Sequence, residues 1–429
     1  MQDRVVLKPI FVSFEKSFSR GVPAREKVME ASIERWEELK RVVGEEVIVE
    51  KPFVFTSLSD FSKLYRELHL DIDALIIQRL FGGDHRRLVK FGLLGFPVIF
   101  IGSSVVYGDV IAYINYYGGR AFYFKDYEGL RDFVDVLKAY RRIRKSVAIV
   151  FTSTGLPSYS TVGGGWDLEK ARRKFGIEFT FVSNENLLNE FRTIDRREVE
   201  ELFRKLVKHA DVVKVDDENI VKALRLYVAM KNFIERVGAN MLTITCAEEI
   251  FYKNNVTPCL PLVLFKDEGL PASCEGDVSA LLAMSFLMYL SGKPAFMGNL
   301  WYLDEKGVFR LSHDVFPLKF CDGECRYELH DFHDKGYGVT TYVEVEKNSE
   351  ITLARMHFDF NRILVFKATI LESHQGIACR QSLDIKVENS TKLEKYLLEY
   401  GHHFSAIPGD YVNKVIQLAK MFNISVEKL

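Results

Sequence analysis

Two carboxylates and an amide bracket a strongly apolar segment of this 429-residue chain, "CEGDVSALLAMSFLMYLSGKPAFMGN". Glu275 and Asp277 precede a helical run that is almost wholly apolar, and Asn299 ends the strand-like run that follows it. Because Glu275 and Asp277 lie two residues apart, they point to different sides of the helix start. One of them is accounted for as a helix cap that meets unpaired N–H groups. The other would be costly at the edge of the interior without a partner, and a metal ion is one such partner.

The longer stretch "TPCLPLVLFKDEGLPASCEGDVSALLAMSFLMYLSGKPAFMGN" resembles the central signature of the L-fucose isomerase/L-arabinose isomerase superfamily. In that group a helix-opening carboxylate follows a Cys-rich strand and a second carboxylate ends the next strand, and the spacing of Glu275 and Asn299 fits this pattern. "RLSHDVFP" is similar to the family's His-containing segment, and "YGHHFSAIPGDYVNKVIQLAKMFNI" is similar to its C-terminal motif. The order of two α/β domains and a β-rich third domain agrees as well.

The resemblance implies an enzyme that interconverts aldoses and ketoses with a divalent metal, Mn²⁺ or another cation such as Mg²⁺. It implies that Glu275 is a metal ligand and acid/base, that Asn299 stands in the second carboxylate's place, and that His403 is the imidazole ligand. His313 matches a histidine that serves as a ligand in the arabinose isomerase branch. Oxygen and imidazole ligands suit such a cation. The cation would acidify a hydroxyl, polarise the carbonyl and stabilise an ene-diol, while a carboxylate moves the proton between C1 and C2.

Asn299 departs from the family pattern. An amide oxygen binds a hard cation, but it carries no charge and accepts no proton at neutral pH. Three outcomes therefore stay open: Glu275 performs both proton transfers, Asp277 or Asp304 supplies the second group, or the protein no longer isomerises sugars. The expected catalytic residues are accordingly Glu275, Asn299 and Asp277.

Three further residues are expected to contact the substrate: Trp301, His402 and Arg380. Aromatic faces stack on the C–H surfaces of sugars, although core packing explains Trp301 nearly as well. A guanidinium at Arg380 could recognise an anionic substrate group, although a surface ion pair is the favoured explanation. His402 adjoins His403, and only one of two neighbours in a strand faces the metal.

The bulk composition is that of an ordinary soluble globular protein, with 48% hydrophobic and 27% charged residues. Its length is enough for two or three domains. With 58 basic and 59 acidic residues the net charge is −1, which gives no indication of a nucleic-acid or membrane partner. Six cysteines in so long a chain do not indicate a disulfide framework, and the N-terminus does not read as a signal peptide. We therefore expect a reduced, cytoplasmic protein.

Alternating strand-like and helical runs predict an α/β fold with two doubly wound parallel-sheet domains. The first domain, 1–144, contains "VVLKPIFV", "DALIIQ", "PVIFIG" and "AFYF". The second, 145–300, runs from "SVAIVF" through "IEFTFVS", "DVVKV" and "NMLTITC" to the apolar helix and the strand "PAFMGNL". Helical periodicity then nearly disappears, and "EITLARMHF", "RILVFKATIL" and "SLDIKVE" predict antiparallel strands. The third domain, 301–429, is therefore expected to be β-rich and to end in a helix.

One loop, "FCDGECRYELHDFH", brings two cysteines and two histidines together, which raises the possibility of zinc. Its residues are Cys321, Cys325, His330 and His333. The spacing C-x₃-C-x₄-H-x₂-H lacks the usual zinc knuckle, so a polar turn with histidines that face solvent or substrate is favoured.

Two other motifs also have simpler explanations beside the functional ones. The glycines of "TSTGLPSYSTVGGGWD" could bind an anion, but the segment has neither G-x-G-x-x-G nor a P-loop lysine. A flexible loop with Asp167 as the helix cap is favoured there. In "FGGDHRR" (81–87), Asp84 is favoured as a helix cap, with substrate contact as the alternative.

The expected function is a metal-dependent aldose–ketose isomerase that converts a small sugar through an ene-diol, with its site around Glu275, Asn299, His313 and His403. The alternative is a non-catalytic relative that binds a sugar or sugar phosphate, which Asn299 favours. A third class, a nucleotide-dependent α/β enzyme, is suggested only by the glycines around 155–165. The resemblance also implies a homo-oligomer, a trimer or hexamer, with pockets shared between subunits.

Overall fold

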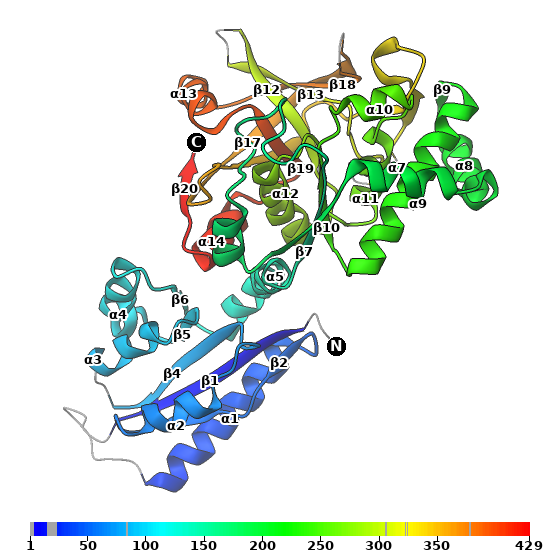
Figure 1. The fold of residues 1–429 in the computed structure, drawn as a ribbon. Helices are drawn as coiled ribbons and strands as arrows, with labels where there is room; N and C mark the ends of the chain where they lie inside the picture. The colour runs from blue at the N-terminus through cyan, green and yellow to red at the C-terminus, as the bar shows by residue number, and fades with distance from the viewer. Residues whose placement is uncertain are drawn as a thin grey trace. The chain divides into compact units, whose positions relative to one another are not determined.

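The computed structural model describes residues 4–14, 24–82, 85–304, 307–321, 323, 325–376 and 379–429. The chain divides into two compact units (Figure 1). One comprises the described parts of Met1–Arg142 and Lys420–Asn423, and the other those of Ile143–Ala419 and Ile424–Leu429. All the residues expected to bind metal or substrate lie in the second unit.

The first unit is built on a parallel sheet in the order β2-β1-β4-β5-β6, with β3 paired to the far part of β1. β1 (Val5–Ser13) is buried at every residue, as expected for a parallel strand covered on both faces. The parallel sheet predicted for this part of the chain is thus confirmed. The other strands are β2 (Val47–Val49), β3 (Phe53–Phe55), β4 (Ala74–Phe81), β5 (Val98–Ile101) and β6 (Ala121–Phe124). The helices are α1 (Arg25–Val43), α2 (Asp60–Glu67), α3 (His85–Leu88), the 3₁₀ helix η1 (Val89–Leu93), α4 (Ser104–Tyr116) and α5 (Tyr127–Arg144).

The second unit contains a second parallel sheet, in the order β11-β10-β7-β8. Its strands are β7 (Val147–Phe151), β8 (Glu178–Val182), β10 (Met241–Ile244) and β11 (Ala272–Ser273). The helices between them are α6 (Leu168–Phe175), α7 (Asn184–Thr193), α8 (Arg196–His209), α9 (Asp217–Val237), α10 (Glu249–Lys253) and α11 (Cys259–Asp267). This sheet confirms the second doubly wound block.

The C-terminal region is a closed antiparallel barrel with strand order β16-β19-β12-β13-β18-β17, which closes because β17 also pairs with β16. β20 adds to β17 in parallel. The strands are β12 (Phe296–Asp304), β13 (Val308–His313), β16 (Glu350–Met356), β17 (Arg362–Gln375), β18 (Gln381–Lys386), β19 (His403–Pro408) and β20 (Ser425–Lys428). Two helices, α13 (Ser390–Tyr400) and α14 (Val412–Met421), complete the region. The expected fold class, α/β with a β-rich C-terminal part, is confirmed.

Two strand assignments were wrong. The strand expected to end the second parallel block, β12, pairs antiparallel with β13 and β19 and belongs to the barrel. "DVVKV" forms β9 (Val212–Lys214), which pairs with β14 (Tyr327–His330) in a small separate sheet with β15 (Thr340–Val343). A short apolar run predicts a strand but not its partners. β13 follows β12 directly, whereas β19 and β14 lie about a hundred residues from the strands they pair with.

The apolar helix α12 (Val278–Ser291) lies between the parallel sheet and the barrel. It contacts β10 and β11 on one side and β16 and β19 on the other, and its residues 278–288 and 290 are buried. A helix enclosed on all sides is expected to be apolar all round. Its N-terminus therefore opens inside the protein.

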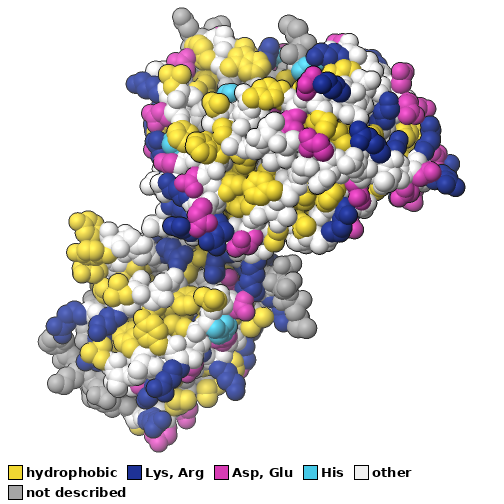
Figure 2. Space-filling view, in the orientation of Figure 1, with side chains coloured by type: hydrophobic (Ala, Val, Ile, Leu, Met, Phe, Trp, Pro, Cys, Tyr) yellow, Lys and Arg dark blue, Asp and Glu magenta, His cyan; other side chains and the backbone are white. Residues whose placement is uncertain are grey.

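No helix in the described part of the chain is long and apolar enough to cross a membrane. On the face drawn in Figure 2, basic and acidic side chains are intermingled over the surface of each unit. This distribution agrees with the near balance of charges in the sequence.

Candidate active site

A tight turn between β11 and α12 presents Glu275. Glu275 and Gly276 both have a left-handed backbone, with φ of 57° and 67°, and the Asp277 N–H donates to the Cys274 carbonyl at 3.1 Å. Two successive residues of positive φ closed by such a bond form a type I′ turn. Glycine is needed at 276 because a Cβ there would lie 2.8 Å from the Leu156 side chain. The turn leaves the Glu275 side chain 20% exposed.

Asp277 is fully buried and caps α12. Its Oδ1 accepts from the Ala280 N–H at 2.7 Å, which confirms that one of the two carboxylates is the helix cap. Its Oδ2 accepts from Arg355 Nη1 at 2.7 Å and from His403 Nδ1 at 3.0 Å. Burial opposes ionisation, but the Arg355 guanidinium and His403 outweigh it and hold the pKa of Asp277 below its ordinary value. Both oxygens are engaged, so this geometry suits positioning rather than proton exchange with a substrate.

Arg355 is the residue that sequence reasoning missed. It is 1% exposed and also donates to the Tyr400 carbonyl at 3.0 Å and to the Gly163 carbonyl at 2.8 Å. A guanidinium so deeply buried needs a carboxylate partner. The signal was present in "EITLARMHF", where an arginine interrupts an apolar strand, but the sequence does not say which carboxylate it meets.

Glu275, His313 and His403 come together from three different elements. Glu275 Oε1 lies 3.6 Å from His313 Nε2, and Glu275 Oε2 lies 3.7 Å from His403 Nε2. The hydroxyl of Thr161, another residue that the sequence did not single out, donates to Glu275 Oε2. Burial opposes ionisation of Glu275, but the two imidazoles and this hydroxyl outweigh it, so the pKa of Glu275 lies well below its ordinary value. Glu275 is thus an anion that faces two histidines.

These residues fit a divalent cation. The ligand atoms of Glu275, His313 and His403 lie within 4.8 Å of one another, and two ligands of one ion are about 3–4 Å apart. His403 Nε2 and Asn299 Oδ1 are buried and have no hydrogen-bond partner among the described residues. Asn299 pairs with His403 across β12 and β19, so their side chains lie on the same face of the barrel wall. Buried polar atoms without partners are costly, and a cation would satisfy both.

The hydrogen bonds of His403 and His313 favour different tautomers of the two rings. Because Asp277 accepts from His403 Nδ1, the neutral ring keeps its lone pair on Nε2, as a metal ligand with a carboxylate partner does. In His313, Nδ1 accepts from the Asp314 N–H at 2.9 Å, so we assign the proton of the neutral ring to Nε2. That proton would have to leave before Nε2 could bind a cation. The tautomer of His403 therefore suits a metal ligand, whereas the tautomer of His313 suits a hydrogen-bond donor to Glu275.

Two of the residues expected to contact substrate adjoin this cluster. Trp301 lies two residues after Asn299 on β12, hence on the same face of the strand, and is 40% exposed. The exposed His402 ring has its centroid 4.7 Å from that of His403. Both positions border the candidate ligands.

Arg380 belongs to a neighbouring cluster. Its Nη2 donates to Asp334 at 2.7 Å, and its backbone N–H donates to Asp314 at 2.7 Å. Asp334 is 76% exposed, so Arg380 forms an ion pair at the surface, as was considered for it.

The zinc arrangement considered for the cysteine–histidine loop does not form. Cys321 and Cys325 are joined by a disulfide, which the sequence did not predict. His330 instead contacts Glu328 at 2.8 Å, while His333 contacts a different carboxylate, described below. The other four cysteines, Cys246, Cys259, Cys274 and Cys379, are free.

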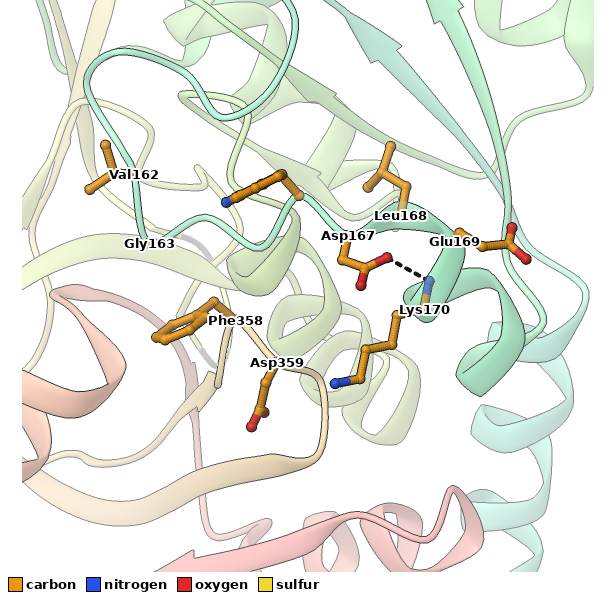
Figure 3. A pocket seen from close by; sticks show the side chains of 9 residues that line it. Val162, Gly163, Asp167, Leu168, Glu169, Lys170, Phe358 and Asp359 are labelled. Atoms are coloured by element: carbon orange, nitrogen blue, oxygen red, sulfur yellow. Dashed lines mark hydrogen bonds between the residues drawn. The ribbon is translucent and has the colours of Figure 1, made fainter.

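The glycine loop packs against the start of α12. The Gly164 carbonyl accepts from the Ser279 N–H at 2.8 Å, and Asp167 caps α6 through the Lys170 N–H at 3.0 Å, as expected. Beside this loop lies a hollow of about 860 Å³, shown in Figure 3, whose lining includes Val162 and Phe358. The candidate ligands do not line it. The proposed cap at Asp84 lies outside the described residues.

No protein-family model matches the chain. Curated proteins named sulfoquinovose isomerase do match it. Those of Priestia aryabhattai and Priestia megaterium are 24% identical over 224 residues, 49% of this chain and 49% of each relative. That of Clostridium sp. (strain MSTE9) is 27% identical over 284 residues, 59% of this chain and 62% of the relative. The match therefore spans about half the length of the first relatives.

Proposed function

We propose that this protein is a metal-dependent aldose–ketose isomerase that converts a sugar through an ene-diol. The observation that carries the proposal is the buried Nε2 of His403, which Asp277 leaves with a free lone pair 3.7 Å from the Glu275 carboxylate. The similarity to proteins named sulfoquinovose isomerase supports the same class of reaction. Sulfoquinovose is accordingly the first sugar to test.

In this proposal Glu275, Asn299 and His403 hold the cation. A bound divalent cation such as Mn²⁺ supplies polarisation of the substrate carbonyl and acidification of the neighbouring hydroxyl. Glu275 takes the proton from C2 and returns it to C1. Thr161 keeps the carboxylate oriented through its hydroxyl, and Asp277 fixes the tautomer of His403.

Isotope exchange tests the proposal directly. The protein, stripped of metal and reloaded with Mn²⁺, is incubated in D₂O with sulfoquinovose and with a panel of aldoses and ketoses. Mass spectrometry then reports both ketose formation and deuterium gained at carbon. Glu275→Gln should abolish both. The matched control is Glu50→Gln, because Glu50 is 22% exposed and also contacts a histidine, His69, at 2.6 Å in the first unit; it should leave both unchanged.

A non-catalytic sugar-binding protein is the second candidate, and the amide at Asn299 favours it. In that case the protein would bind Mn²⁺ and a sugar, measured by calorimetry, without incorporating deuterium. Exchange that survives in Glu275→Gln would also contradict the isomerase proposal.

We also propose a homo-oligomer, a trimer or hexamer. Val162, Trp166 and Phe358 are 76%, 59% and 47% exposed, and apolar side chains exposed together often mark a contact surface. Light scattering on the purified protein tests this, and a monomer at micromolar concentration would contradict it.

A further inference from the structure

Aldose–ketose isomerisation moves two protons, one from C2 to C1 and one from O2 to O1. Glu275, held as an anion, suits the carbon proton. The carboxylates considered for the second transfer are poorly placed. Asp277 is fully buried with both oxygens engaged, and Asp304 lies five residues beyond Asn299 on β12, about 17 Å along an extended strand. The oxygen proton therefore needs another carrier.

A histidine–carboxylate pair lies on residues that the proposed metal site does not use. His333 Nε2 lies 2.7 Å from Asp314 Oδ2, and the buried Asp314 accepts from the Arg380 N–H through its other oxygen. The His333 ring stacks on Phe332 with centroids 3.9 Å apart. With Nε2 on the carboxylate, Nδ1 is the atom that can exchange a proton, and the side chain is 27% exposed.

The backbone at this histidine is also unusual. His333 and Asp334 have φ of 53° and 55°, a left-handed conformation that few residues other than glycine adopt. Holding two successive side chains there costs conformational energy, and such residues cluster at functional sites. The conformation turns the imidazole onto Asp314.

This pair adjoins a residue that contacts Glu275. Asp314 directly follows His313, whose Nε2 lies 3.6 Å from Glu275. Cys379 forms a cluster with Asp314 and His333 in which the polar atoms lie within 4.8 Å of one another. Burial, together with the charges of Asp314 and Glu275, raises the pKa of the Cys379 thiol. Cys379 thus adjoins the pair formed by His333 and Asp314.

We propose that His333, oriented by Asp314, is the second proton carrier and moves the proton between O1 and O2 of the sugar. This inference rests on the proposed isomerase function. In the aldose-to-ketose direction the imidazolium gives its proton to O1 while Glu275 takes the proton from C2. The electron pair of the broken C2–H bond forms the C1=C2 bond of the ene-diol. The neutral imidazole then takes the proton from O2 as Glu275 returns its proton to C1, so both groups regain their starting state.

Chemical rescue distinguishes a proton carrier from a structural histidine. His333→Ala should lower kcat about 10²–10⁴-fold, the usual contribution of a general acid–base, and added imidazole should restore at least tenfold, because the side chain is open to solvent. His333→Gln keeps an N–H that can donate to Asp314, so it controls for misfolding. Its kcat should fall as far as that of His333→Ala, and added imidazole should not restore it. Calorimetry should find the Mn²⁺ affinity of both variants unchanged.

The matched control is His374→Ala. His374 is 29% exposed and faces Asp384 at 3.4 Å on the barrel, and its loss should leave kcat unchanged. If the wild type is active and His333→Gln has the same kcat, this inference is wrong but the proposed function stands. The same holds if His333→Ala loses kcat and added imidazole does not restore it. A wild type without exchange on any sugar would overturn the proposed function and this inference with it. A second metal ion per chain, lost in Cys379→Ser, would also overturn it, since His333 would then be a ligand.

Discussion

Asp277 contacts both a buried arginine and a candidate metal ligand. Asp277→Asn should therefore change both the free energy of unfolding of the second unit and its affinity for Mn²⁺. The substitution keeps an oxygen for the Ala280 N–H but removes the charge that Arg355 and His403 contact at 2.7 and 3.0 Å. Arg355 would remain buried without a counter-ion.

The cost follows from the contacts that remain. Removing one partner of a buried ion pair costs about 3–5 kcal/mol. Arg355 keeps two carbonyl acceptors, from Tyr400 and Gly163, so we expect the lower end, about 3 kcal/mol. His403 also loses the carboxylate that fixes its tautomer, and loss of such a partner lowers metal affinity about 10–100-fold.

The assay separates the two effects. Urea unfolding of the second unit is followed by the fluorescence of Trp166 and Trp301 in a Trp36→Phe background, and Mn²⁺ affinity by calorimetry on metal-free protein. The matched control is Asp73→Asn, because Asp73 forms an equally buried pair with Arg141 at 2.9 Å in the first unit.

In this assay the control should leave both the unfolding of the second unit and the Mn²⁺ affinity unchanged. The reasoning would be refuted if Asp277→Asn cost less than about 1 kcal/mol, well below the range for a broken buried pair, or if its Mn²⁺ affinity matched that of the wild type.

Two further predictions concern single residues. The Asp60 carboxylate is buried, which opposes ionisation, but it accepts from two backbone N–H groups at 2.9 Å, and its pKa is lowered from 3.8 to about 2. Asp60→Asn should therefore lower the free energy of unfolding by about 2 kcal/mol above pH 4; the difference should vanish as the pH falls toward 2, and a pH-independent difference in denaturant titrations would contradict this. A Cβ at Gly165 would lie 2.4 Å from Ser279 Oγ at a φ of 67°, so Gly165→Ala should raise the unfolding rate and cost about 1–3 kcal/mol. Gly163→Ala, where a Cβ meets nothing within 4 Å, should be close to neutral in the same stopped-flow measurement.

Much of the fold could be predicted from local patterns. Most parallel strands of both sheets are apolar runs, such as β5 and β7, separated by helices, and that alternation is a property of the sequence alone. The carboxylate at the start of α12 was likewise predictable as a cap, because free N–H groups at any helix start favour an acceptor at that position. Strand partners were not predictable in the same way, since β12 and β9 carry no local mark of the sheets they join.

The candidate site was also only partly predictable from the sequence. The resemblance of the segments around Glu275, Asn299 and His403 to the isomerase superfamily is what implies oxygen and imidazole ligands at these positions. Only the tertiary structure decided that Asp277 faces Arg355, 78 residues away, and that His333 turns onto Asp314. A charged side chain accepts burial only where the folded chain supplies its counter-charge. Arg355 lies on β16, which pairs with β17 and β19 in the barrel, and no short segment of the sequence encodes those pairings.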